Sequence, residues 1–421
     1  MSGSGGAAAD VDLLITGIGE LCRMGEGEGP QAGPAQGDLG LVRDAALASR
    51  DGRIVAAGPR VEVEAAVRAR TTVDVNGALV LPGWVDAHTH LLFGGTREDE
   101  FAMRAAGKSY REIAAAGGGI HASVRHFREA SDEAVLDRAR RNLDRALALG
   151  TTTIEIKSGY GLRAEDEFRA LRLIRTLAGE HPVRIVATFL GAHEFPRDRP
   201  REAYVREIVA TMIPRVADED LAEFCDVFCE DGVFTPAESR AVLEAAARHG
   251  LRLKLHADEF GDTGGGRLAA ELGAVSADHL HGTRPEVAAD LARAGVVGVL
   301  LPGTSFFLNL SEKAPARAMV EAGLPLAVAT DFNPGSSMSQ SMPLMTTLAC
   351  VQLGLTPAEA LVAGTVNGAA ALARSGRAGR LRPGFPADFQ ILDLENHVQL
   401  PYHYGVSHVR RVAVGGTWVT S

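Results

Sequence analysis

The segment Leu79-Val80-Leu81-Pro82-Gly83-Trp84-Val85-Asp86-Ala87-His88-Thr89-His90 decides the fold, because an apolar run ends there in two histidines. In an extended strand, residues i and i+2 face the same side, so His88 and His90 point the same way. Two neutral imidazoles on one side can share a metal ion such as zinc or iron. Two surface histidines at a strand end are the alternative interpretation, and the rest of the chain must decide between them.

The composition is ordinary for a globular protein that can hold a large barrel and a smaller domain. The chain has 421 residues, of which 46% are hydrophobic and 23% are charged. Its net charge of −10 argues against nucleic acid or an anionic membrane as the main partner. No apolar run reaches the roughly 18 residues of a membrane span, and the first residues lack the features of a signal peptide.

The cysteines indicate the redox compartment. Their positions form no zinc knuckle, so we expect four reduced thiols and a cytoplasmic protein. They are Cys22, Cys225, Cys229 and Cys350.

Eight apolar stretches predict strands, and helical stretches separate most of them. The predicted strands cover residues 79–87, 152–157, 183–191, 224–229, 251–256, 276–280, 295–301 and 326–330. Helix starts such as Thr235-Pro236-Ala237-Glu238, a capping box with proline at the first helical position, support this alternation. The pattern predicts an α/β fold, a (β/α)8 TIM-like barrel, with a doubly wound open sheet as the alternative. No glycine-rich dinucleotide-binding pattern follows any of these strands.

Both ends of the chain differ from this middle part. Short apolar runs split by turn residues occupy the stretch from about residue 10 to 78 and the stretch after residue 374. We expect the two ends to pair into one small β-sandwich. The predicted domains are therefore residues 1–78 and 375–421 for the two parts of the sandwich, and residues 79–374 for the barrel.

Polar side chains gather at the C-terminal ends of the predicted barrel strands, where enzymes of this fold hold their chemistry. Histidine or an acid follows six of the eight strands. Surface residues scattered without a common role would not fall so regularly at strand ends. These strand ends supply His88 and His90, His193 and Glu194, Glu230 and Asp231, His256 and Glu259, Asp278 and His279, and Asp331. The pattern favours a metal site over two unrelated surface histidines.

This arrangement resembles the metal-dependent amidohydrolase superfamily, and six local motifs narrow the resemblance to the imidazolonepropionase family. The motifs cover residues 93–101, 157–161, 191–196, 256–260, 276–280 and 330–336. The resemblance implies a barrel flanked by a split sandwich. It also implies hydrolysis of the cyclic amide of 4-imidazolone-5-propanoate to N-formimidoyl-L-glutamate, a step of L-histidine degradation.

Opening a cyclic amide requires a nucleophilic water, a base, an acid and polarisation of the carbonyl. A bound dication lowers the pKa of its water and stabilises the developing oxyanion. The residues suited to bind it, and implied by the resemblance, are His88, His90, His256 and Asp331. We expect one divalent metal per chain, zinc or iron, because the predicted strand 224–229 offers no lysine that could bridge two metals.

The candidate acid–base residues are Glu259, His279 and Asp331. Asp331 is expected to accept a proton from the water, and the resemblance implies that Glu259 contacts substrate and helps to move protons. His279 could orient the hydroxide or hold the carbonyl, with His281 as its competitor.

The remaining candidates concern the substrate. A propionate tail favours a guanidinium fork, and Arg97 is the match to the family, with Arg104 and Arg111 as alternatives. Lys157 is expected to support Tyr160 or the electrostatics of the pocket. The full predicted substrate-binding set is Arg97, Tyr160, His193, Glu259, Asn333, Gly335 and Ser336.

The resemblance also suggests a homodimer. One alternative function is that of a purine or pyrimidine deaminase. Such an enzyme could share the metal ligands, but it has less need for an arginine such as Arg97, which is expected here to bind a carboxylate tail. A catalytically inactive scaffold is the second alternative, although such proteins usually lose metal ligands, and here all four are present.

Overall fold

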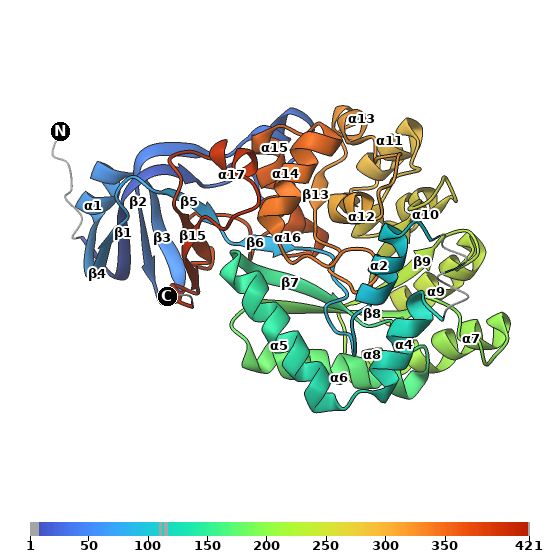
Figure 1. Cartoon of the computed structure of the whole chain (residues 1–421). Coiled ribbons are helices and arrows are strands. Elements are labelled where there is room, and N and C mark those ends of the chain that lie inside the picture. The colour runs from blue at the N-terminus through green and yellow to red at the C-terminus, as the bar shows by residue number, and fades with distance from the viewer. Residues whose placement is uncertain (1–7, 109–111, 113–116, 420–421) are drawn as a thin grey trace.

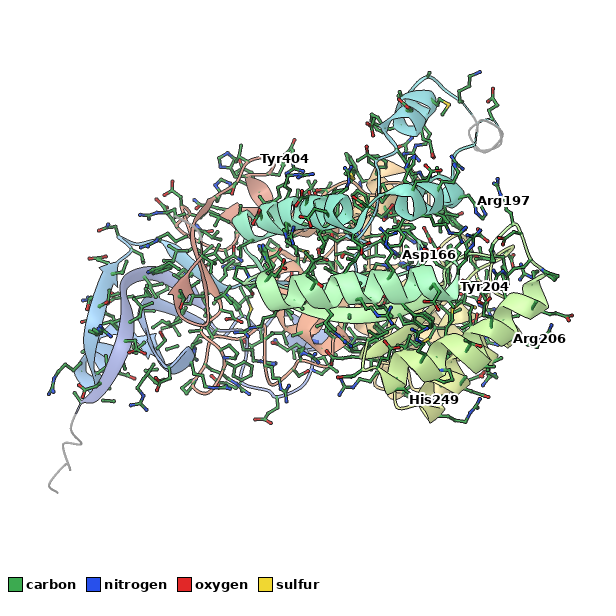
Figure 2. All side chains as sticks on the ribbon, turned by 90° about the horizontal axis from the view of Figure 1, so that it is seen from below. Asp166, Arg197, Tyr204, Arg206, His249 and Tyr404 are labelled. Atoms are coloured by element: carbon green, nitrogen blue, oxygen red, sulfur yellow. The ribbon has the colours of Figure 1, made fainter. Side chains whose placement is uncertain are left out.

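The computed structural model describes residues 8–108, 112 and 117–419, so Arg111 lies outside the described residues. A barrel and a smaller β-domain lie side by side (Figure 1). Side chains fill the space between the barrel helices and strands when the molecule is seen from below (Figure 2).

Eight strands form the barrel, and each pairs in parallel with its neighbours along the chain. They are β6 (Trp84–Asp86), β7 (Thr151–Lys157), β8 (Arg184–Ala192), β9 (Phe224–Cys229), β10 (Arg252–Ala257), β11 (Ser276–His279), β12 (Val297–Leu300) and β13 (Leu326–Val328).

The barrel closes just beyond β6 and β13. The backbone N–H of Asp331 donates to the carbonyl of His88 at 3.0 Å, and the N–H of His90 donates to the carbonyl of Phe332 at 3.0 Å. The (β/α)8 prediction is therefore confirmed, and the open-sheet alternative is wrong because these bonds join the first and last strands. The same two bonds place His88, His90 and Asp331 together.

Helices alternate with the strands and cover the outside of the barrel (Figure 1). The stripe predicted for α5, Val135, Ala139, Leu143 and Leu147, is buried. Burying a leucine or valine of this kind stabilises the fold by about 1.5–3 kcal/mol. The barrel helices are α2 (Glu98–Ala105), α4 (Ile120–Glu129), α5 (Asp132–Ala148), α6 (Ala164–Glu180), α7 (Arg201–Glu207), α8 (Ile213–Asp218), α9 (Pro236–Arg248), α10 (Gly265–Leu272), α11 (Pro285–Arg293), α12 (Pro302–Phe307), α13 (Ala316–Glu321), α14 (Met342–Leu353), α15 (Pro357–Val362) and α16 (Gly368–Ala371).

The small β-domain is built from both ends of the chain. Strand β14 pairs antiparallel with β5 and so joins the C-terminal strands to the N-terminal ones. The strands are β1 (Ala9–Cys22), β2 (Leu41–Arg50), β3 (Arg53–Pro59), β4 (Val67–Asp74), β5 (Leu79–Pro82), β14 (Phe389–Leu392), β15 (Val409–Val414) and β16 (Thr417–Trp418). Helix α1 (Arg60–Ala66) packs beside these strands, whereas α17 (Gln399–Tyr402) packs against α14 of the barrel.

The predicted strand 79–87 is in fact two strands, β5 in the small sheet and β6 in the barrel. Gly83 separates them, and a Cβ at this position would lie only 2.1 Å from Oγ1 of Thr152. Glycine is therefore required where the chain passes from one domain to the other. The exact domain boundaries, residues 1–78, 79–374 and 375–421, stay a prediction.

All four cysteines are free thiols in this structure. Among the described residues, none of the helices combines the length and the apolar character that crossing a membrane requires.

Candidate metal centre

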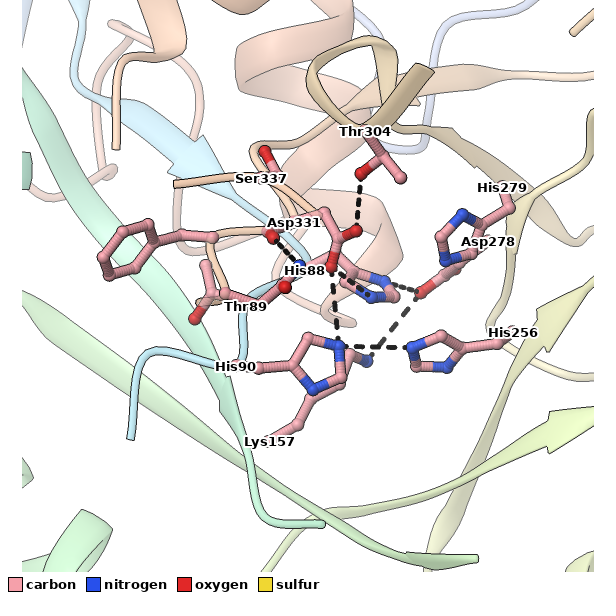
Figure 3. Close-up of polar contacts among 12 residues, drawn as sticks. His88, Thr89, His90, Lys157, His256, Asp278, His279, Thr304, Asp331 and Ser337 are labelled. Carbon is pink, nitrogen blue, oxygen red and sulfur yellow. Dashed lines mark hydrogen bonds and ion pairs between the residues drawn. The ribbon is translucent and has the colours of Figure 1, made fainter. Parts of the chain in front are cut away.

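Three imidazoles and one carboxylate converge at the C-terminal end of the barrel (Figure 3). Oδ1 of Asp331 lies 3.6 Å from Nε2 of His88 and 3.5 Å from Nε2 of His90. Nε2 of His256, from β10, lies 3.3 Å from Nε2 of His90. All four side chains are buried. The structure thus brings together the residues that the sequence predicts as metal ligands.

The chemistry of these atoms fits a divalent metal. Nε2 of His88 is buried and has no hydrogen-bond partner within the part of the chain that the structure describes, while its Nδ1 lies 2.6 Å from Asp278. Nδ1 of His256 likewise lies 3.0 Å from a carboxylate, that of Asp226. A histidine that donates through Nδ1 presents a lone pair on Nε2, which is the usual arrangement of a metal-binding imidazole. Neutral imidazole and carboxylate oxygen suit both zinc and iron.

Asp331 is held by a residue that sequence reasoning missed. Oγ1 of Thr304, in α12, donates to Oδ2 of Asp331 at 2.6 Å. Burial raises the pKa of Asp331 to about 6, and the bond from Thr304 opposes that rise. No sequence signal pointed to Thr304, because β12, the strand before α12, ends without a histidine or an acid.

His279 and Glu259 lie beside this cluster. Nε2 of His279 is 3.6 Å from Oε2 of Glu259, and the His279 ring centroid is 5.3 Å from that of His256. Burial, with the carboxyls of Asp331 and Glu230 in addition, raises the pKa of Glu259 well above its usual value. A carboxyl with a raised pKa is suited to carry a proton between reacting atoms. His281 instead contacts Oγ of Ser305 through Nε2 at 2.6 Å.

The loop that carries Glu259 is organised by its neighbour Asp258. The Asp258 carboxylate accepts hydrogen bonds from Gly265 N at 3.0 Å, Gly266 N at 3.1 Å and Thr283 Oγ1 at 2.8 Å. These bonds tie the end of β10 to the start of α10, so Asp258 fixes the backbone from which Glu259 projects.

Tyr160 and His193 form one wall of the site. The His193 ring stacks on that of His90, with ring centroids 4.8 Å apart. The centroid of the Tyr160 ring lies 6.0 Å from that of His90. Burial lowers the pKa of His193 to about 3 and raises the pKa of Tyr160. The Glu167 carboxylate holds the loop around Tyr160, because it accepts hydrogen bonds from Gly159 N at 3.0 Å and from Gly161 N at 2.7 Å.

Arg97 is anchored by Glu100, which the sequence interpretation did not foresee. Nε and Nη2 of Arg97 donate to the two Glu100 oxygens at 2.8 and 2.6 Å. A Cβ on Gly335 would lie 2.3 Å from Nη1 of Arg97, so the guanidinium packs closely against that glycine. Arg104 approaches the same residue and donates to the Gly335 carbonyl at 3.1 Å from both Nη atoms.

The Asn333 side chain makes hydrogen bonds within the loop that follows β13. Its Oδ1 accepts from the backbone N–H groups of Gly335 and Ser336, each at 2.8 Å. Its Nδ2 donates to the carbonyl of Asp331 at 2.6 Å. The structure therefore places Gly335 beside Arg97 and ties Asn333 and Ser336 into the same loop, and the direct contact of these three residues with substrate stays a prediction.

Curated relatives are similar to this chain over nearly their full length. The imidazolonepropionase of Symbiobacterium thermophilum is 49% identical, with 96% of each chain covered. The imidazolonepropionase of Haloarcula marismortui is 48% identical, covering 98% of this chain and 96% of the relative. That of Geobacillus kaustophilus is 46% identical, covering 94% and 95%.

Solved structures share the fold at lower identity. An adenosine deaminase from Xanthomonas campestris with bound zinc has a TM-score of 0.71 and 22% identity, covering 98% of this chain and 93% of that one. An ochratoxinase from A. niger has a TM-score of 0.69 and 19% identity, covering 98% and 96%. The amidohydrolase family matches residues 79–419. The chain belongs to the amidohydrolase family and, within it, to the imidazolonepropionase family.

Proposed function

We propose that this chain hydrolyses the ring C–N amide bond of 4-imidazolone-5-propanoate to N-formimidoyl-L-glutamate, a step of L-histidine degradation. The observation that carries the proposal is the buried convergence of His88, His90, His256 and Asp331, together with Arg97 at the start of α2. The imidazolonepropionases that match 94% or more of this chain support the same reaction.

The cofactor is one divalent metal per chain, zinc or iron, held by His88, His90, His256 and Asp331. When bound, such a metal lowers the pKa of a water and polarises the substrate carbonyl. One metal suits this site because β9 carries no lysine to bridge a second.

The protein side chains move the protons. Asp331 accepts the proton of the attacking water. His279 donates to the carbonyl oxygen as negative charge develops there. Glu259 delivers a proton to the leaving ring nitrogen, and its raised pKa supports that role.

The substrate tail lies against Arg97. Glu100 holds Nε and Nη2 of Arg97, so the Nη1 edge beside Gly335 meets the propionate. Tyr160, His193, Asn333 and Ser336 complete the substrate pocket in this proposal. Charge-assisted hydrogen bonds from Arg97 to the carboxylate tail hold the substrate in one orientation. They thus fix the position of the substrate ring relative to the histidines.

The test is ultraviolet loss of the imidazolone chromophore with purified, metal-loaded protein. A deaminase is the competing candidate, and an aminopurine tested in parallel separates the two. Turnover of the imidazolone alone supports the proposal, whereas turnover of the aminopurine alone refutes it. Metal analysis that finds two equivalents per chain would contradict the proposed metal count.

We also propose a cytoplasmic homodimer. Its four free thiols suit a reducing compartment. Exposed Val351 of α14, with Tyr402 and Tyr404, offers apolar surface for a second copy, and Tyr404 projects from the surface in Figure 2. Sedimentation velocity tests the dimer, and a single species of monomer mass would contradict it.

A further inference from the structure

Lys157 is fully buried at the end of β7, beneath the histidine cluster (Figure 3). Its Nζ lies 2.7 Å from Asp226, 2.9 Å from Glu155 and 3.8 Å from Asp278. Burial lowers the pKa of this ammonium, but the carboxylates of Asp226, Glu155 and Asp278 outweigh burial and raise it. Lys157 takes no part in the proposed proton transfers.

Two of these carboxylates also contact metal-binding histidines, each through the oxygen that faces Lys157. Oδ2 of Asp278 lies 2.6 Å from Nδ1 of His88, and Oδ2 of Asp226 lies 3.0 Å from Nδ1 of His256. Oδ2 of Asp226 therefore contacts Lys157 and His256 together, whereas Oδ2 of Asp278 contacts His88 and lies 3.8–3.9 Å from both Lys157 and Lys254. His90 differs, because its ion-pair contact, with Asp331 at 3.5 Å, is made through Nε2.

We propose that Lys157 is a positioning residue for the metal, because its ammonium holds Asp226, the carboxylate that contacts His256. The inference rests on the proposed metal site. Carboxylates that contact a ligating histidine fix its ring and its tautomer. Holding Asp226 in place therefore fixes the ring of His256 and the direction of its Nε2 lone pair.

Lys254 provides a matched control in the same barrel interior. It is as fully buried as Lys157, but its Nζ bonds backbone carbonyls, at 3.3 Å to Ala87 and 3.2 Å to Ala371. Lys254 lies 3.5 Å from Glu155 and 3.9 Å from Asp278, so the two lysines are about equally far from Asp278 and differ at Asp226. Removing either lysine deletes one buried ammonium, but only Lys157 closely contacts Asp226.

The experiment measures zinc affinity by competition with a chromophoric chelator, for the wild type, Lys157→Met and Lys254→Met. We expect Lys157→Met to lose about 10–100-fold in zinc affinity, the usual effect of removing a group that supports metal ligands. Lys254→Met should lose less than about threefold. Equal losses in the two variants, or no loss in Lys157→Met, would overturn the inference.

A second readout is independent of catalysis and of affinity. The visible absorption of the cobalt-substituted protein reports ligand geometry, so Lys157→Met should alter that spectrum and Lys254→Met should leave it unchanged. Lys157→Gln keeps a hydrogen-bond donor in place and should restore part of the affinity. This variant also serves if Lys157→Met does not fold, and wild-type affinity together with a wild-type spectrum in Lys157→Gln would then refute the inference.

The wild-type protein separates this inference from the proposed function. If the wild type binds no zinc or cobalt in the competition assay, the metal site itself is wrong and the inference fails with it. If the wild type binds metal and both lysine variants bind it equally well, the inference alone fails.

Discussion

The hydroxyl of Thr304 donates to Oδ2 of Asp331 at 2.6 Å, and this bond turns the other oxygen toward the histidines. Oδ1 lies 3.5–3.6 Å from Nε2 of His90 and His88. The two carboxylate oxygens of Asp331 therefore have different environments, one bonded to a protein hydroxyl and one facing the metal site.

Thr304→Val keeps the side-chain shape and removes this hydroxyl. We expect kcat to fall about tenfold with little change in KM, because the Asp331 carboxylate loses the bond that fixes its rotation. Steady-state kinetics measure the effect. Thr346→Val is the control, since Thr346 is also buried but bonds the carbonyl of Pro343 in α14. Equal kcat values in both variants and the wild type would show that Thr304 has no such role.

Arg97→Met removes the guanidinium proposed to bind the propionate tail. A hydrogen bond to a charged group contributes about 1.5–3 kcal/mol, so KM should rise about 10–100-fold. A substrate analogue whose tail is an amide provides the control, because the variant and the wild type should process it with similar kcat/KM. An equal loss of kcat/KM for both substrates would show that Arg97 does not bind the carboxylate.

Glu259→Gln replaces the proposed proton donor by an isosteric amide. We expect kcat to fall about 100–10,000-fold, the range for losing a general acid, while the bound metal stays at the wild-type level. Stopped-flow kinetics and metal analysis on the same sample check both parts. A variant that loses its metal along with its activity would instead make Glu259 a metal ligand.

Glu359 gives a pH-dependent contribution to stability far from the reaction. Burial raises its pKa, but hydrogen bonds from Arg317 and from the Thr356 backbone outweigh burial and lower it. A lowered folded pKa means that the ionised form stabilises the fold above the unfolded pKa of about 4.3, and that this stability is lost as pH falls through the folded pKa.

Glu359→Gln should therefore reduce the free energy of unfolding by about 0.5–1 kcal/mol at neutral pH, since Arg317 is partly exposed. The difference from the wild type should shrink as the medium is acidified below the folded pKa. Thermal melts across a pH series measure this trend. A difference that stays constant or grows in acid would refute the ionic explanation.

The parts of the fold that follow from periodicity were predictable from the sequence. The eight barrel strands were recognisable as short apolar runs. His88, His256 and Asp331 follow the C-terminal ends of such strands, and these ends all lie on one face of a barrel. Barrel topology alone brings such residues together, so their convergence needed no knowledge of the loops.

The supporting contacts could not be predicted in the same way. Thr304 and Glu100 act through loop and helix-end geometry, and neither occupies a position that strand or helix periodicity distinguishes. The division of strand 79–87 at Gly83 depends on the close approach of Thr152, a contact between distant segments. The sequence places Lys157 at a strand end, but its partners Asp226 and Asp278 are set by the packing of the barrel interior.

The most direct test of the account is mass spectrometry of the product formed from 4-imidazolone-5-propanoate in isotopically labelled water. The metal-loaded protein should give N-formimidoyl-L-glutamate with one labelled oxygen in the new carboxylate, and the chelator-treated protein should give none until a divalent metal is restored. Unchanged substrate with the metal-loaded protein, or equal product after the metal is removed, would contradict metal-dependent hydrolysis of the ring.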